Sequence, residues 1–119
     1  HYPLRRQRQM CIRDRWLSLP IDTFVLPSHG KPFKGLHTRI EQLHEHHRAR
    51  LSETLEACQT PKHAFEIIPV LFRRKLDNHQ LSFAMGEAIA HLNYLWHQKK
   101  LRRSLCEDGI WRFCAASPL

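Results

Sequence analysis

The stretch FVLPSHG at residues 24–30 decides the interpretation of the fold. It closes an apolar run over residues 21–26, which predicts a short buried strand. Pro27 ends this strand because proline has no N–H to give to a sheet ladder. Gly30 suits a tight loop because glycine accepts backbone conformations that are closed to other residues. The pattern therefore predicts His29 on a loop at the carboxyl end of a strand, where α/β proteins usually bind ligands and metals.

Two helices are predicted directly after this loop. Residues 36–58 carry apolar side chains at intervals of three and four, which indicates one long amphipathic helix. A second helix is predicted over residues 61–72, with Thr60 as its cap and Pro61 in its first turn. We expect Pro69 to kink or break that helix. Its predicted buried face comprises Phe65, Ile68, Leu71 and Phe72.

A third helix and a hairpin complete the predicted order. The helix is capped by Asp77 or Asn78 and reaches about residue 99. Residues 101–106 and 110–114 are expected to pair as a β-hairpin around Asp108-Gly109, since glycine accepts the positive φ of such a turn. Trp111 and Phe113 lie two residues apart and should both cover the third helix. Three helices followed by a two-stranded wing are typical of a winged helix.

The loop and the elements after it resemble a known family. The motif LPSHG, the segment PFKGLH at residues 32–37 and a long His/Arg-rich helix resemble the end of a metallo-β-lactamase-fold hydrolase. The following residues resemble the winged-helix-like C-terminal extension of one branch, and the resemblance covers residues 16–113. It implies a mainly α fold with a small β-hairpin. Residues 16–35 would be the last strand and metal loop of a truncated metallo-β-lactamase domain, and residues 36–119 a helical C-terminal domain.

The resemblance implies that His29 is a metal ligand. In such hydrolases the histidine of this loop binds one of two metals, usually zinc, and the other ligands come from a His-x-His-x-Asp-His loop and two later positions. None of these is present here, so we expect an incomplete site, no catalytic residue in this chain and no hydrolase activity from the chain alone. The alternative for His29 is a loop histidine that is hydrogen-bonded to backbone.

The helix over residues 36–58 contains a second group of histidines. The sequence HEHHR at residues 44–48 fails the H-E-x-x-H zinc motif because Arg48 occupies the required histidine position. His44 and His47 lie one turn apart, yet a packed or solvated helix face is favoured for them. His37 follows the loop closely enough to reach the cleft of the parent enzyme, although we do not favour this role.

Basic residues at the wing suggest a second class of function. They are Lys99, Lys100, Arg102, Arg103 and Arg112. Winged helices often place such residues on nucleic-acid phosphates, and one branch of the resembled family cleaves RNA. The alternative function is therefore a winged-helix nucleic-acid-binding module. A solvated face is favoured, because phosphate-binding surfaces usually carry a larger basic excess.

The start of the chain is treated separately. Residues 1–15 carry five arginines and one aspartate, and so supply +4 of the formal net charge of +8. This segment resembles translated sequencing-adapter sequence, and we interpret it as foreign; the alternative is a disordered basic arm. Because the chain begins with His1, we expect a fragment that lacks its N-terminal metallo-β-lactamase domain.

Composition limits the location and partners. No apolar run approaches the ~18–20 residues that span a bilayer, and the first 20 residues contain no secretory apolar segment. The four cysteines form no C-x-x-C pair, so we expect reduced thiols, no Cys106–Cys114 bridge and a cytoplasmic protein without a membrane partner. The helical domain would shape either the substrate entrance, for RNA or another anionic substrate, or a homodimer contact.

Overall fold

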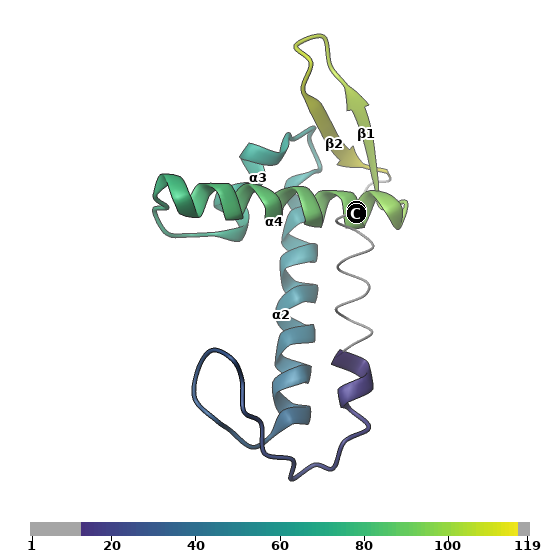
Figure 1. Ribbon diagram of the computed structural model, residues 1–119. Coiled ribbons are helices and arrows are strands. Elements are labelled where there is room, and N and C mark those ends of the chain that lie inside the picture. The colour runs from purple at the N-terminus through teal and green to yellow at the C-terminus, as the bar shows by residue number, and fades with distance from the viewer. Residues whose placement is uncertain (1–12, 117–119) are drawn as a thin grey trace.

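The structure is a computed structural model that describes residues 13–116. After a helical turn at residues 13–16, the elements are α2 (Leu36–Ala57), α3 (Ala64–Leu71), α4 (Asn78–His97), β1 (Leu101–Leu105) and β2 (Trp111–Ala115). Helix α4 crosses one end of α2, and the loop before α2 lies at the other end (Figure 1). The hairpin lies on the side of α4 away from the length of α2. The fold is mainly helical with a C-terminal antiparallel hairpin, as predicted.

Helix α2 matches its prediction within one residue. It begins after Gly35, whose φ of 87° is in the left-handed region that favours glycine. Three of its buried positions, Leu36, Ile40 and His47, lie on the predicted apolar stripe, whereas the burial of Thr54 was not predicted. Thr54 is completely buried, and its hydroxyl donates to the Arg50 carbonyl at 2.8 Å, which satisfies a polar group inside the core.

Helix α3 differs from its prediction at the start and in its buried face. It begins after His63, and the His63 N–H donates to Glu66 Oε1 at 3.1 Å in a capping box. Thr60 is not the cap because the next residues are drawn to the hairpin: Lys62 exchanges both backbone hydrogen bonds with Phe113. The side chain of Phe65, predicted to be buried, is 57% exposed.

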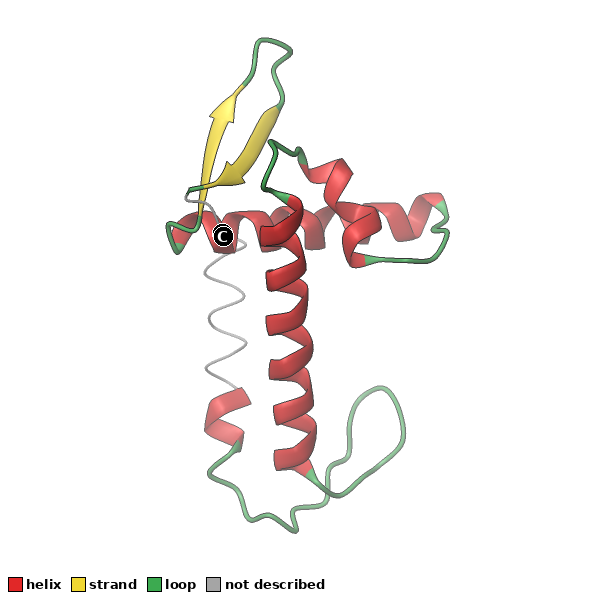
Figure 2. Cartoon of the chain, turned by 180° about the vertical axis from the view of Figure 1, so that it is seen from behind, coloured by secondary structure: helices red, strands yellow, loops and turns green. Residues whose placement is uncertain are grey.

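Pro69, which was expected to kink or break the second helix, does not end α3. The helix continues past Pro69 to Leu71, so the missing N–H at Pro69 removes a single intrahelical hydrogen bond two residues before the end. Ile68 and Leu71 are buried as predicted, together with Ile67. Figure 2 shows α3 as a short helix against α4, beside the end of α2.

Helix α4 has a cap at each end. Asp77 Oδ1 accepts from the Gln80 N–H at 2.8 Å, and the Gln80 side chain accepts from the Asp77 N–H at 3.0 Å. At the other end Lys99 has a φ of 63°, and the Lys100 N–H donates to the Leu95 carbonyl at 3.0 Å. This is the Schellman pattern, in which glycine usually holds the left-handed position. Lys99 thus occupies a strained backbone position that the sequence did not indicate.

The predicted hairpin is confirmed. Leu101 pairs with Ala115 and Leu105 with Trp111 in an antiparallel register, and Gly109 has a φ of 80° in the turn. Phe113 is buried as predicted. Trp111, which was also expected to cover α4, is 47% exposed. Among the described residues the three cysteines are free, so the predicted absence of a Cys106–Cys114 bridge is confirmed.

The predicted strand at residues 21–26 is wrong for this chain. Val25 and Phe33 form an isolated bridge through hydrogen bonds of 2.8 and 3.0 Å, and the rest of the segment is loop. The apolar side chains of Ile21 and Leu26 are 74% and 72% exposed. The physical reason is that this part of the chain meets no neighbouring strand within residues 13–116, so its backbone has no ladder to join.

Residues 13–16, which overlap the segment interpreted as foreign, form a helical turn. Asp14 Oδ1 lies 3.5 Å from His44 Nε2 on α2. Residues 1–12 lie outside the described part, so the interpretation of residues 1–15 as foreign stays a prediction. No helix within residues 13–116 is long and apolar enough to cross a membrane.

The core lies where α4 crosses α2 and α3 and meets the hairpin. Its centre is made by side chains that are at most 1% exposed, including Cys58, Ile67, Ala88, Leu92 and Leu101. These residues come from the end of α2, α3, α4 and β1. The core therefore joins all the regular elements at one end of α2.

The core assignment predicts unequal effects for two leucines. Leu92→Ala removes a completely buried side chain and should lower the free energy of unfolding by about 2–5 kcal/mol. Leu105→Ala, at a position 57% exposed on β1, should change it by no more than about 0.5 kcal/mol. Urea unfolding followed by circular dichroism measures both, and equal losses would contradict the assignment.

Candidate functional site

His29 lies on an exposed bend at the end of α2 that is remote from the hairpin. Gly30 beside it has a φ of 97°, so the tight loop predicted from the sequence is present. The loop borders a groove of about 790 Å³ between the segment before α2 and the first turns of α2. Its apolar lining includes Trp16, Leu19, Phe24, Leu26, Leu36, Ile40 and Leu43.

His29 does not make a metal site by itself. No group of three or more His, Cys, Asp or Glu side chains within residues 13–116 is arranged to hold a metal ion. A zinc site needs three or four converging ligands, so the residues described here do not fit a metal without others. The role of His29 as a ligand therefore stays a prediction.

The other predicted histidines point to different partners. His37 Nε2 lies 2.8 Å from the Leu19 carbonyl, which ties the segment before the His29 loop to the start of α2. The ring of His47 is 7% exposed and lies 5.6 Å from that of His91, between centroids. His44 instead faces Asp14. His44 and His47 are thus not brought together as a metal pair in the described structure.

Two residues of the predicted basic wing make structural contacts. The Arg103 guanidinium carbon lies 3.5 Å from the Trp96 ring centroid and 5.0 Å from that of Trp111, and Arg103 donates to Asn93 Oδ1 at 3.1 Å. A cation between two aromatic faces stabilises the packing of the hairpin on α4. The sequence did not reveal this role, because the three partners lie on α4 and β2.

Arg112 is held by the hairpin turn. It donates two hydrogen bonds to the Asp108 carboxylate, at 3.1 and 3.0 Å. Those bonds, together with the Ile110 N–H, lower the pKa of Asp108 below its usual value. Because the pair largely neutralises itself, Arg112 contributes little positive potential to the surface.

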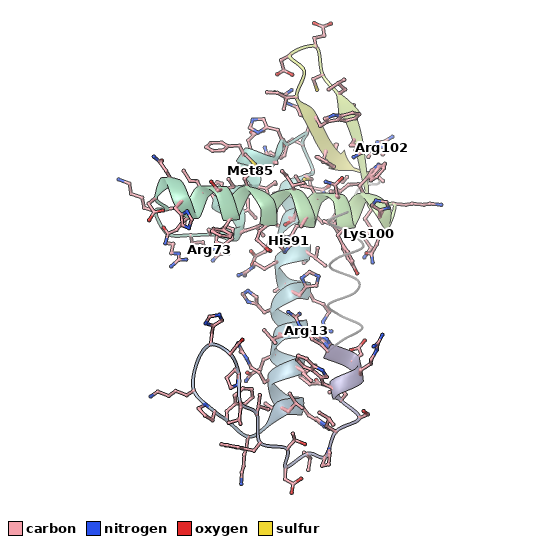
Figure 3. The ribbon with its side chains drawn as sticks, in the orientation of Figure 1. Arg13, Arg73, Met85, His91, Lys100 and Arg102 are labelled. Atoms are coloured by element: carbon pink, nitrogen blue, oxygen red, sulfur yellow. The ribbon has the colours of Figure 1, made fainter. Side chains whose placement is uncertain are left out.

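The remaining wing residues are exposed. Lys99 terminates α4 with its strained backbone, and Lys100 and Arg102 follow it with exposed side chains. Figure 3 shows Lys100 and Arg102 near the end of α4, far along α2 from the loop before it. Helix α2 has 22 residues and so spans about 33 Å. The basic surface and the His29 loop are therefore separate places on the molecule.

A thiol nucleophile is not supported by the environment of Cys58. Burial raises the pKa of this thiol to about 11, and the nearby Cys114 adds to the rise. A thiol with this pKa is almost entirely protonated near neutral pH, and the thiolate is the reactive form. Cys58 is therefore a core residue.

Two further hollows escaped the sequence interpretation. One is an apolar groove of about 490 Å³ between α3, α4 and the hairpin, lined in part by Phe65, Met85 and Trp111. The other lies between α2 and α4, beside His47 and His91. Both hollows are formed by residues from different elements, so they cannot be predicted from the spacing of residues along the chain.

Comparison with known proteins identifies the family. The family model described as "Metallo-beta-lactamase-like, C-terminal domain" matches residues 51–116, more than half of the chain. The chain belongs to this family. The resemblance drawn from the His29 motif and the order of the helices is thereby confirmed.

Two solved structures agree with this assignment. A beta-lactamase domain protein from Burkholderia ambifaria is 50% identical, with a TM-score of 0.87 over 90% of this chain. A metallo-beta-lactamase family protein from Thermus thermophilus is 29% identical, with a TM-score of 0.73 over 89% of this chain. No curated protein matches the chain. This metallo-beta-lactamase-like chain spans about a third (32%) of each of these two structures.

The stacking of Arg103 in this metallo-beta-lactamase-like domain can be tested against its neighbour. Arg103→Lys should lower the free energy of unfolding by about 1 kcal/mol, because an ammonium group cannot stack as a planar guanidinium does. Arg102→Lys, at an exposed position on the same strand, should change it by less than about 0.5 kcal/mol. Urea unfolding measures both, and an effect of Arg102→Lys as large as that of Arg103→Lys would contradict the structural role.

Proposed function

We propose that this chain is the C-terminal part of a metal-dependent hydrolase of the metallo-β-lactamase fold, in which His29 supplies one metal ligand. The observation that carries the proposal is the position of His29 within an apolar surface that the described structure leaves uncovered. The side chains of Ile21, Phe24 and Leu26 are 74%, 57% and 72% exposed. Phe24 and Leu26 line the same groove as His29, and exposed apolar side chains gathered in this way are expected to be covered by another body.

An N-terminal catalytic domain is the proposed cover. About two thirds of each solved relative lies outside the part that this chain matches. Strands of such a domain would give residues 21–26 the ladder partners that they lack here. In this proposal residues 16–35 belong to the catalytic domain, and residues 36–119 form a winged-helix-like C-terminal domain with α4 in the place of the recognition helix.

The proposed role of the loop is to hold one imidazole in a fixed place. Pro27 restricts the backbone before the loop, and Gly30 permits the sharp turn after it. In the complete site a pair of zinc ions would polarise the substrate and supply hydroxide near neutral pH. The chain alone, with one imidazole, would not hydrolyse substrate. Thioesters, lactams, phosphodiesters and RNA all remain candidate substrates.

The metal role predicts a selective loss in the complete protein. In the parent protein expressed from the upstream-extended reading frame, His29→Ala should remove about one metal ion per chain, because a structured zinc site rarely survives the loss of a ligand. His79→Ala, at an exposed position on α4, serves as the control and should keep the full content. Elemental analysis of the dialysed proteins measures both. Unchanged metal content in His29→Ala would refute the assignment.

Nucleic-acid binding is the second candidate function. It is favoured by the exposed side chains of Lys100 and Arg102 and by the half-exposed ring of Trp111 at the other end of the hairpin, since backbone phosphates and bases recruit these residue types. The pairing of Arg112 with Asp108 and the stacking of Arg103 weaken it, because both cations already have partners.

A salt series tests this second function. If both exposed cations contact phosphates, the variant with Lys100→Gln and Arg102→Gln should reduce the slope of log affinity against log salt for a single-stranded oligonucleotide by about 1.4, or about 0.7 for each contact. Arg74→Gln with Lys75→Gln removes two exposed cations between α3 and α4, and should leave the slope unchanged. Fluorescence anisotropy gives the affinities. Equal slopes for the two double variants would exclude a phosphate-binding wing.

A further inference from the structure

The hollow between α2 and α4 has an unusual lining. It has a volume of about 250 Å³ and lies beside the crossing of the two helices. His46, His47 and Arg50 line it from α2, and Glu87 and His91 line it from α4. Figure 3 shows His91 on α4 where the helix passes α2. Arg13 adds a second guanidinium group to the lining, although the donors named below all lie on α2 and α4.

Two histidines of this pocket and one arginine nitrogen are withdrawn from water. His47 and His91 are 7% and 4% exposed. Arg50 donates to Glu53 Oε1 at 2.7 Å through a terminal nitrogen. Its Nε is buried and has no hydrogen-bond partner among the residues that the structure describes. A buried N–H without an acceptor costs about 1–3 kcal/mol, so an acceptor in the pocket would be stabilising.

The charges of the lining favour a negative ligand. Glu87 is the one carboxylate among the described residues that line the pocket, against three imidazoles and two guanidinium groups. The Glu87 side chain is 47% exposed, and its Oε2 lies 3.9 Å from His91 Nδ1. Glu53 lies outside the pocket lining; it accepts from Arg50 at 2.7 Å and lies 3.5 Å from Arg73, so its one negative charge is shared between two guanidinium groups and offsets the charge of Arg50 only in part.

We propose that this pocket binds an oxyanion of the size of phosphate, with Arg50 Nε and the imidazoles of His47 and His91 as donors. Charge-assisted hydrogen bonds from arginine and protonated histidine are the strong bonds through which proteins hold phosphate groups. The site lies on α2 and α4 and does not use His29, so it stands apart from the proposed metal site and can be tested on this chain alone.

Binding should be coupled to protonation. His91 Nδ1 lies 2.6 Å from the Glu87 carbonyl, so in a neutral imidazole its proton serves that bond and Nε2 has only a lone pair. An oxyanion would favour the doubly protonated ring, and affinity should rise as the pH falls from about 8 to about 6. The titratable and charged groups that face the two buried rings are His46, Arg50, Glu87, Tyr94 and Arg13.

Titration with inorganic phosphate tests the proposal. Imidazole resonances of the full chain are followed at constant ionic strength, with chloride as the replaced anion. The resonances of His47 and His91 should shift in a saturable manner. Arg50→Gln should weaken binding about tenfold or more. Arg48→Gln is the matched control: Arg48 is also on α2 and also paired with an acid three residues away, but lies outside the pocket.

A second variant and a second ligand extend the phosphate titration. Arg50→Lys retains the charge without Nε and should bind more weakly than the unchanged chain, and it replaces Arg50→Gln if thermal unfolding shows that variant to be unfolded. Dimethyl phosphate separates the two sources of the ligand: equal binding indicates a phosphodiester, and a preference for inorganic phosphate indicates a terminal phosphate. An absence of saturable shifts, or equal weakening by Arg48→Gln, would overturn the proposal.

Discussion

Helix α4 packs against α2 and α3 through side chains that are buried from water. The hairpin packs on the same core, so this contact positions all the helices and strands from α2 to β2. Leu92 and Ile67 are completely buried there, and Leu101 carries the same core into the hairpin. Burial of such side chains stabilises a fold by about 1.5–3 kcal/mol each. The core occupies one end of α2, so the loop at the other end is left without comparable packing.

The elements predicted correctly are those whose causes lie within a few residues of one another. The stripe of α2, the capping box of Asp77 and Gln80, and the turn at Gly109 are all local. The start of α3 was predicted too early because a distant contact delays the helix: the backbone of Lys62 pairs with that of Phe113 on the hairpin. The strand expected at residues 21–26 does not form because no strand within residues 13–116 lies beside it.

The candidate sites also differ in whether their features are local in the sequence or arise only when distant residues meet in the fold. His29 was singled out because a motif carries it, and no further metal-binding group gathers around it within residues 13–116. Arg103 was placed in a basic surface because charge is visible in a sequence, whereas its position between Trp96 and Trp111 arises only when α4 meets the hairpin. The pocket of His47 and His91 unites residues 44 positions apart, and no spacing rule connects them.

Gly35 is the joint between the two ends of the molecule. It precedes an uninterrupted helix of 22 residues, and no side chain makes a capping hydrogen bond at the start of that helix. The helix therefore acts as a lever: a rotation of about 10° at this residue would swing the hairpin along an arc of about 6 Å, given a length of about 33 Å. The two backbone torsions of Gly35, together with the contact between His37 and the Leu19 carbonyl, thus set the direction of α2 relative to the segment before it.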